Sequence, residues 1–138
     1  MKKKKIEFRS TCPISTALDI IGDKWSLLIV RDMVFKGMGT YGDFLNGGEG
    51  IATNILADRL MLLEAGGIIT KHNHPDSKAK FLYKLTPKGI DLVPALVEII
   101  SWSEKYHDVH PHAKQFAKQL RNNKETVIKQ IVESLKNS

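Results

Sequence analysis

The fold of this chain is decided by the stretch Gly50–Glu64, which reads GIATNILADRLMLLE. Leu56, Leu60 and Leu63 recur at helical spacing, so a helix over about residues 51–64 is expected to place one side on a core. The other side is small or polar and comprises Ala52, Thr53, Asn54, Asp58 and Arg59. Small side chains allow close approach to DNA, while threonine, asparagine and arginine can hydrogen-bond to base edges and phosphates. The stretch therefore favours two interpretations, a recognition helix in the DNA major groove or an amphipathic helix with a solvated face.

The positive charge of the 138-residue chain is concentrated at its two ends. The formal net charge is +6 at pH 7; residues 1–10 and 113–138 each carry +4, and residues 11–112 carry −2. Nucleic-acid binding by the middle segment would therefore depend on a locally basic surface. Residues 71–84 offer one, because they hold four lysines and a single acidic residue. Residues 1–10 are expected to form a flexible basic tail that either solubilises the protein or adds to DNA affinity.

Composition excludes several classes of protein. A hydrophobic share of 42% is enough for one compact domain. No segment approaches the roughly 20 apolar residues of a membrane span, and the first residues lack the apolar segment of a signal peptide. The single cysteine, Cys12, excludes an intramolecular disulfide framework. We therefore expect a cytoplasmic protein without a membrane partner.

Motifs of catalysis and metal binding are missing from the sequence. It contains no Gly-x-Ser-x-Gly and no His-Glu-x-x-His, and Gly47–Gly50 lacks the Gly-Lys-Ser/Thr that completes a phosphate loop. The histidines at 72, 74, 107, 110 and 112 are the one hint of a metal site, and no cysteine or carboxylate pattern completes it. We expect neither enzyme activity nor a bound metal or cofactor.

Helices are also expected before the stretch Gly50–Glu64. Two are predicted over about residues 13–22 and 24–35, the second capped by Asp23. Thr40 and Asp43 have the spacing of a capping box, which predicts a short third helix directly after Thr40. A turn containing three glycines then leads into the central stretch. Two helices joined by a glycine-bearing turn are the outline of a helix-turn-helix.

A β-hairpin is expected directly after the central helix. Its strands are predicted at Ile68–Asn73 and Phe81–Leu85, and alternate side chains of the second strand, starting with Phe81, are expected to face the core. The polar tip at residues 74–80 could reach DNA phosphates, or could be an ordinary surface loop. A helix-turn-helix followed at once by such a hairpin is the order of a winged helix. The candidate contacts of the hairpin are Lys71, Ser77, Lys78 and Lys80.

A long helix from about Lys88 to His107 is expected to need a partner. Its apolar rows consist of Leu92, Leu96 and Ile99 and of Val93, Val97 and Ile100, and Trp102 adds aromatic surface. Such surface outside a small core favours a second copy of the chain as the partner. A last amphipathic helix is predicted over residues 112–135, and it requires support from the long helix or from a partner subunit because isolated helices are marginal.

Taken together, these motifs resemble those of the HxlR family of bacterial transcriptional regulators, which are MarR-like winged-helix proteins. The similarity runs from Cys12 to about Tyr106. The segments that carry it are CPISTALDIIGDKWSLLIVRD from Cys12, YGDF from Tyr41, GIATNILADRLMLLEAGGII from Gly50 and YKLTPKG from Tyr83. The resemblance implies a homodimeric DNA-binding repressor or activator, with a recognition helix, a wing and a dimer interface formed from terminal helices.

The resemblance also implies roles for individual residues. Thr53, Asn54 and Arg59 would face the groove, Thr40 would approach the DNA backbone, and Lys78 and Lys80 would lie on the wing. Dimerisation would use the first helix and the long helix. The residues that we expect in the dimer interface are Ile14, Leu18, Leu92, Leu96, Ile99 and Trp102.

Cys12 is the candidate sensing residue. Some members of the family respond to oxidants, quinones or aldehydes through a cysteine near the N-terminus, and Cys12 occupies the matching position. The N-terminal end of a helix favours the thiolate form, which is the reactive one. The alternative is a buried, unreactive thiol beside the dimer interface. With no second cysteine in the chain, a switch would need a bond between subunits, a small-thiol adduct or alkylation.

The sequence as a whole predicts a mainly α protein with a small β-hairpin, a winged helix-turn-helix with long terminal dimerisation helices. Its expected parts are a basic tail at residues 1–10, a DNA-binding and dimerisation domain at 11–110, and an accessory helix at 111–138. The expected function is a sequence-specific homodimeric regulator, acting as a repressor on a pseudo-palindromic operator in double-stranded DNA. The alternative is a winged-helix module that binds other proteins and no DNA.

Overall fold

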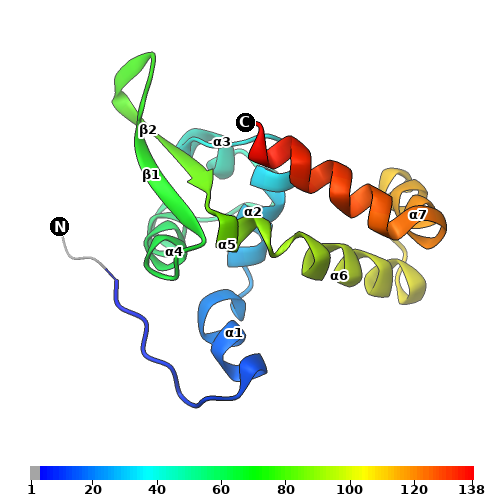
Figure 1. The fold of residues 1–138 in the computed structure, drawn as a ribbon. Coiled ribbons are helices and arrows are strands. Elements are labelled where there is room, and N and C mark those ends of the chain that lie inside the picture. Colours follow the sequence, from blue (N-terminus) through cyan, green and yellow to red (C-terminus); the bar gives the residue numbers. More distant parts are fainter. Residues whose placement is uncertain (1–3) are drawn as a thin grey trace. The chain divides into compact units, whose positions relative to one another are not determined.

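The computed structural model describes residues 4–138, so the first three residues of the predicted tail lie outside the described part of the chain. The elements in chain order are α1 (Pro13–Ile21), α2 (Ser26–Phe35), α3 (Tyr41–Leu45), α4 (Thr53–Ala65), β1 (Ile69–His74), β2 (Ser77–Leu85), α5 (Pro87–Ile90), α6 (Val93–Tyr106) and α7 (Pro111–Lys136) (Figure 1). They form two compact units that divide between Gly89 and Ile90.

The core of the first unit is built on the leucine seam of α4. Leu56, Leu60 and Leu63 are all buried, as their helical spacing predicted. Helix α4 contacts α1, α2, α3 and β1, so these leucines lie where the elements of the unit converge. Burying a leucine side chain stabilises a fold by about 1.5–3 kcal/mol, which makes this seam a main source of stability for the unit.

The short helix α3 begins with the predicted capping box. The Asp43 backbone N–H donates to Thr40 Oγ1 at 3.1 Å, and the Thr40 backbone N–H donates to Asp43 Oδ2 at 3.1 Å. Gly39 N–H donates to the same carboxylate oxygen at 3.2 Å. These hydrogen bonds, first from Thr40 and then from Gly39, lower the pKa of Asp43 below its ordinary value. The box confirms the predicted start of α3.

The hairpin is present, but its tip is shorter than predicted. Residues expected to form a loop at 74–80 belong largely to the strands, and the turn itself is Pro75–Asp76. His74 pairs with Ser77 and Asn73 pairs with Phe81, so residues 78–80 form an irregularity in β2. Backbone N–H and C=O groups continue to pair between the strands beyond the apolar residues. Polar residues that a side-chain pattern assigns to a loop therefore belong to the strands. In Figure 1 the hairpin extends beyond the helices of its unit.

The expected alternation of β2 was wrong at its first residue. Phe81 is exposed, and Lys71 Nζ lies 4.0 Å from the centroid of its ring. On the other face of β2, Leu82 packs close to Gly39, where an added Cβ would come within 2.8 Å of Leu82 Cδ1. The Tyr83 backbone N–H donates to Gly39 O at 2.7 Å, so β2 is also held along its outer edge.

The long helix predicted from Lys88 to His107 is interrupted. Helix α5 ends at Ile90, and α6 begins at Val93 with Pro94 in its first turn. Proline lacks an N–H group, and its ring clashes with the carbonyl of the preceding turn, so it suits a helix start and ends a helix that reaches it. The prediction of one continuous helix overlooked this residue.

The second unit consists mainly of α6 and α7, which pack against each other. Val97 of α6 and Ala117 and Leu120 of α7 are buried in it. Helix α7 is slightly longer than predicted and consists of two helical segments, because Asn123 has non-helical backbone angles (φ −146°, ψ 49°). Between residues 4 and 138, no helix combines the length and apolar character needed to cross a membrane.

Candidate nucleic-acid interface

The first turn of α4 is open to its surroundings. The turn before it contains Gly48 and Gly50 with positive φ (94° and 73°), a conformation that side chains other than glycine rarely adopt. Ala52, at the N-cap, provides no side-chain hydrogen bond to the helix, and Ala52, Thr53 and Asn54 are exposed. An exposed helix N-terminus with free backbone N–H groups is suited to bind anions such as phosphates. Three of the five residues predicted on the outer side of this helix therefore lie together on an accessible surface.

The next turns of α4 are held within the fold. Asp58 and Arg59, which were predicted on the same outer side of the helix, with Arg59 facing the groove, are half-buried. Arg59 Nε donates to Asp23 Oδ2 at 2.9 Å, and Arg59 Nη1 donates to Asp58. Lys4 Nζ lies 2.6 Å from Asp58 Oδ1. Because these charges already have partners, the geometry favours a positioning role for Asp58 and Arg59.

Asp23 joins α4 to the start of α2. Its carboxylate accepts hydrogen bonds from the backbone N–H groups of Trp25 and Ser26, at 2.9 and 3.0 Å, and from Ser26 Oγ at 2.5 Å. Burial opposes the charged form of Asp23, but the bonds from Ser26 and Trp25, together with the charge of Arg59, outweigh burial and lower its pKa. The sequence predicted the capping role of Asp23. It did not predict the ion pair with Arg59, because the two residues are 36 positions apart.

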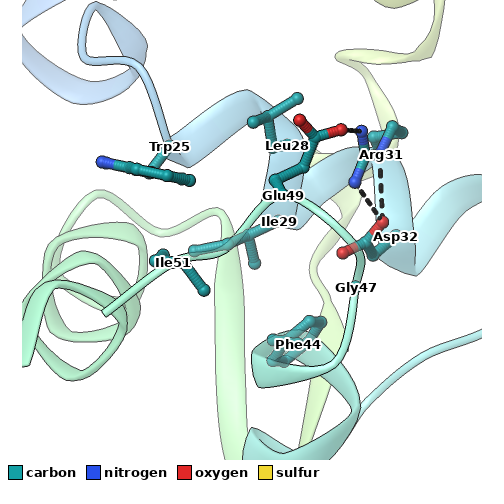
Figure 2. A pocket seen from close by; sticks show the side chains of 9 residues that line it. All are labelled: Trp25, Leu28, Ile29, Arg31, Asp32, Phe44, Gly47, Glu49 and Ile51. Carbon is teal, nitrogen blue, oxygen red and sulfur yellow. Dashed lines mark hydrogen bonds and ion pairs between the residues drawn. The ribbon is translucent and has the colours of Figure 1, made fainter. Parts of the chain in front are cut away.

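A second ion cluster holds the turn between α3 and α4, and sequence reasoning missed it. Arg31 Nη1 donates to Glu49 Oε2 at 2.7 Å, and Arg31 Nε donates to Asp32 Oδ1 at 3.0 Å, as Figure 2 shows. A Cβ added at Gly47 would lie 2.6 Å from Asp32 Oδ2, so the turn passes directly over this carboxylate. The hydrogen bond from Arg31 lowers the pKa of Glu49. The cluster fixes the turn that leads into α4.

A small pocket lies beside this cluster. Its apolar wall is formed by Trp25, Leu28, Ile29, Phe44 and Ile51, and Arg31, Asp32, Gly47 and Glu49 complete the lining (Figure 2). The charged groups of the lining are already paired with one another. We therefore interpret the pocket as a small gap in the packing between α2 and the turn that precedes α4, and not as a ligand site.

The wing presents two exposed lysines. Lys78 and Lys80 are exposed, whereas Lys71 is half-buried over the Phe81 ring and Ser77 is half-buried with Oγ accepting from Ala79 N–H at 3.3 Å. The positive charge of Lys80 contributes to the lowered pKa of Asp43, so the wing lies near the start of α3. Thr40, predicted to approach DNA, already uses its hydroxyl oxygen in the capping box.

Cys12 lies at the N-cap of α1 and is exposed in the single chain. Its backbone carbonyl accepts from Thr16 N–H at 2.9 Å, and Pro13 occupies the first helical position. The predicted position at the helix start is therefore confirmed. This exposure refers to the single chain, so the alternative of an unreactive thiol buried beside the dimer interface stays a prediction.

The residues predicted for the dimer interface fall into two groups. Four have large exposed fractions: Ile14 (71%), Leu18 (51%), Ile99 (48%) and Trp102 (61%). Leu92 is half-buried and Leu96 is buried in the single chain. The exposed group includes residues of both units, on α1 and on α6.

The order α3, turn, α4 and β1–β2 hairpin defines a winged helix-turn-helix protein, as predicted. Residues 20–111 match the HxlR-like helix-turn-helix family, and the chain belongs to this family. Its relatives are named as transcriptional regulators and not as enzymes, as the sequence also predicted.

Three similar proteins illustrate the family. The uncharacterised HTH-type transcriptional regulator sll1512 of Synechocystis sp. is 36% identical over 62% of this chain and 63% of its own length. The structure of PA1607, assigned as a transcription factor, is 41% identical and has a TM-score of 0.66 over 75% of this chain and 70% of PA1607. The oxidised form of the redox regulator HypR is 30% identical and has a TM-score of 0.62 over 71% of this chain and all of HypR.

Proposed function

We propose that the protein is a homodimeric, sequence-specific DNA-binding transcriptional regulator that acts as a repressor in the cytoplasm. The observation that carries this proposal is the exposed, uncapped first turn of α4, which presents Thr53 and Asn54, while Lys78 and Lys80 are exposed on the wing of the same unit. A small residue at Ala52 allows this end of the helix to approach DNA closely. The same arrangement supports α4 as the helix that enters the major groove.

The proposed contacts divide by chemistry. Asn54 can make a bidentate hydrogen bond to N6 and N7 of adenine, and Thr53 can bind either a base edge or a phosphate. Lys78 and Lys80 are exposed and can contact phosphates, and such contacts position the protein but carry no sequence information. In a symmetric dimer the two α4 helices would read half-sites about 34–36 Å apart, one helical turn of DNA. The operator is therefore expected to be pseudo-palindromic.

Dimerisation is proposed through the exposed apolar side chains of α1 and α6. Ile14 and Leu18 on α1, and Ile99 and Trp102 on α6, are large apolar side chains that the single chain leaves exposed, as is typical of residues in an interface. A second copy of the chain would cover them with an equivalent surface. Leu92 and Leu96 would support this interface from within each subunit. Residues 111–138 remain, in this proposal, an accessory helix.

Cys12 is proposed as the residue through which oxidants, quinones or aldehydes act on the regulator. It is exposed at a helix start, next to the α1 surface proposed for dimerisation. The similarity to HypR, which is named as a redox regulator, supports this role. Oxidation is expected to weaken operator binding, and a Cys12→Ser variant should bind equally well with and without oxidant.

The experiment that tests the proposal is selection of preferred sites from random duplex DNA, followed by salt titration of the selected site. A pseudo-palindromic site and a steep fall of affinity with salt are expected, because each neutralised phosphate contributes about 0.9 to the slope of log affinity against log salt concentration. No preferred site and a flat slope would overturn the proposal in favour of a winged-helix module that binds proteins.

A further inference from the structure

The N-terminal segment is bound to the fold at three places. Lys4 Nζ forms an ion pair with Asp58 Oδ1 of α4 at 2.6 Å. Ile6 is half-buried at the end of α4, where a Cβ added at Gly66 would lie 3.2 Å from Ile6 Cδ1. Arg9 binds Asp19 of α1 through its side chain at 2.8 Å and through its backbone N–H at 3.1 Å. From Lys4 onward, this segment is therefore placed by specific contacts.

These contacts give the segment a direction. Ile6 lies at the C-cap of α4, whereas Lys4 lies at Asp58, about 12 Å nearer the start of the helix at 1.5 Å per residue. Followed towards its beginning, the chain thus runs along α4 towards the first turn that holds Asn54. A further 6 Å or so along the axis separates Asp58 from that turn. Figure 1 shows the segment leaving α1 and passing to the side of α4.

The segment also alters the charge of the recognition helix. Asp58 is an acidic residue on a helix proposed to approach DNA phosphates, and an unpaired carboxylate there would oppose binding. Lys4 and Arg59 both pair with this carboxylate. Lys5 is exposed beside Lys4, and two more lysines precede them in the sequence. Because residues 11–112 carry a net charge of −2, Lys4 and its neighbour Lys5 bring positive charge to α4 that the middle segment lacks.

We propose that the N-terminal segment with Lys4 and Lys5 is a DNA-binding arm. In the free protein it is held against α4 by the Lys4–Asp58 ion pair and by the packing of Ile6 at Gly66. When DNA binds, Arg59 keeps its pair with Asp58, and Lys4 and Lys5 bind phosphates at the edge of the groove that α4 enters. The arm adds affinity for duplex DNA of any sequence, because phosphate contacts do not distinguish bases. This inference rests on the proposed DNA-binding function, and it assigns the segment a partner in place of a purely solubilising role.

The test compares the full chain with two variants that each remove two positive charges per subunit. In the Lys4→Gln/Lys5→Gln variant, the slope of log affinity against log salt concentration should fall by about 1.8 per subunit, which corresponds to two lost phosphate contacts. The control is Lys118→Gln/Lys129→Gln on α7, where both lysines are exposed. The control should keep the slope of the unchanged protein. If both variants keep the slope of the unchanged protein, or if both lower it equally, the proposed role of the arm is wrong.

A third variant tests whether the arm must be docked. Ile6→Ser keeps every charge and removes the apolar contact that seats the segment at Gly66. A severalfold loss of affinity, with an unchanged melting temperature, supports docking, whereas unchanged affinity overturns it. Failure of the underlying function has a different signature, because the unchanged protein itself would then show no preferred site and a flat salt slope.

Discussion

Two successive parts of the recognition helix carry similar polar residues but have different surroundings. At its start, Thr53 and Asn54 are exposed, and the N-cap Ala52 provides no side-chain hydrogen bond. One to two turns later, Asp58 and Arg59 are half-buried and paired with Lys4, Asp23 and each other. The comparison teaches that a polar side chain on a candidate recognition helix is available to DNA only if the fold has not already supplied its partner.

The difference follows from the elements that flank the helix. The start of α4 follows a turn with positive-φ glycines, whereas its middle lies beside the capped start of α2 and the N-terminal segment. A guanidinium group that is paired with two carboxylates loses hydrogen bonds and Coulomb energy if it turns away to a base. We therefore assign sequence reading to the first turn and orientation of the helix to the middle.

The largest effect is expected from the buried side of the same helix, which supports both parts. Leu60→Ala should lower the free energy of unfolding by about 2–5 kcal/mol, because it removes a buried side chain and leaves a cavity. Chemical denaturation of the two proteins measures the change. The control is Ala57→Ser on the exposed side, which should change stability by less than about 0.5 kcal/mol. Equal effects of the two variants would contradict the assigned core.

Asn54→Ala sharpens the comparison at the exposed end. It should weaken binding to the selected operator by about 1–3 kcal/mol and leave binding to random duplex DNA nearly unchanged, since a base contact carries discrimination. Competition binding with the two DNAs measures the ratio. A matched Lys78→Ala/Lys80→Ala variant should weaken both DNAs alike. If Asn54→Ala also weakened both equally, the first turn would not read bases.

Arg59→Gln tests the paired part of the helix. Loss of a partly buried ion pair should lower the free energy of unfolding by about 1 kcal/mol, while the preferred DNA sequence stays the same. A double-mutant cycle with Asp23→Asn should show that the two changes are not additive, because both remove one interaction. A change of preferred sequence in the Arg59→Gln protein would show that Arg59 reads bases, and the comparison would fail.

The smallest effect is expected from pH. The pKa of Asp23 in the folded protein is lower than its ordinary value of 3.8, so its carboxylate favours the folded state above that value. This contribution is lost as the pH falls through the folded pKa. Melting temperatures measured over about pH 5 to 2 should therefore fall less steeply for Asp23→Asn than for the unchanged protein. Parallel curves would contradict the assigned role of Asp23.

Local patterns predicted the elements that local physics controls. The leucine seam of α4 and the capping box of Thr40 and Asp43 each depend on residues three or four apart, so their spacing was sufficient. Pro94 was an equally local signal for the break between α5 and α6, and overlooking it produced one helix in place of two. The hairpin was predicted, but its length was not. The strands end where backbone pairing ends, and the alternation of apolar and polar side chains does not reveal that point.

By itself, the sequence determined the winged helix-turn-helix order, the buried side of α4 and the position of Cys12 at a helix start. Only the tertiary structure decided which polar groups of α4 remain free. Arg59 pairs with a residue 36 positions away, and Lys4 pairs with Asp58 across most of the first unit's sequence. Such pairs leave no periodicity in the chain, because their partners meet only after the hydrophobic core has brought separate helices together.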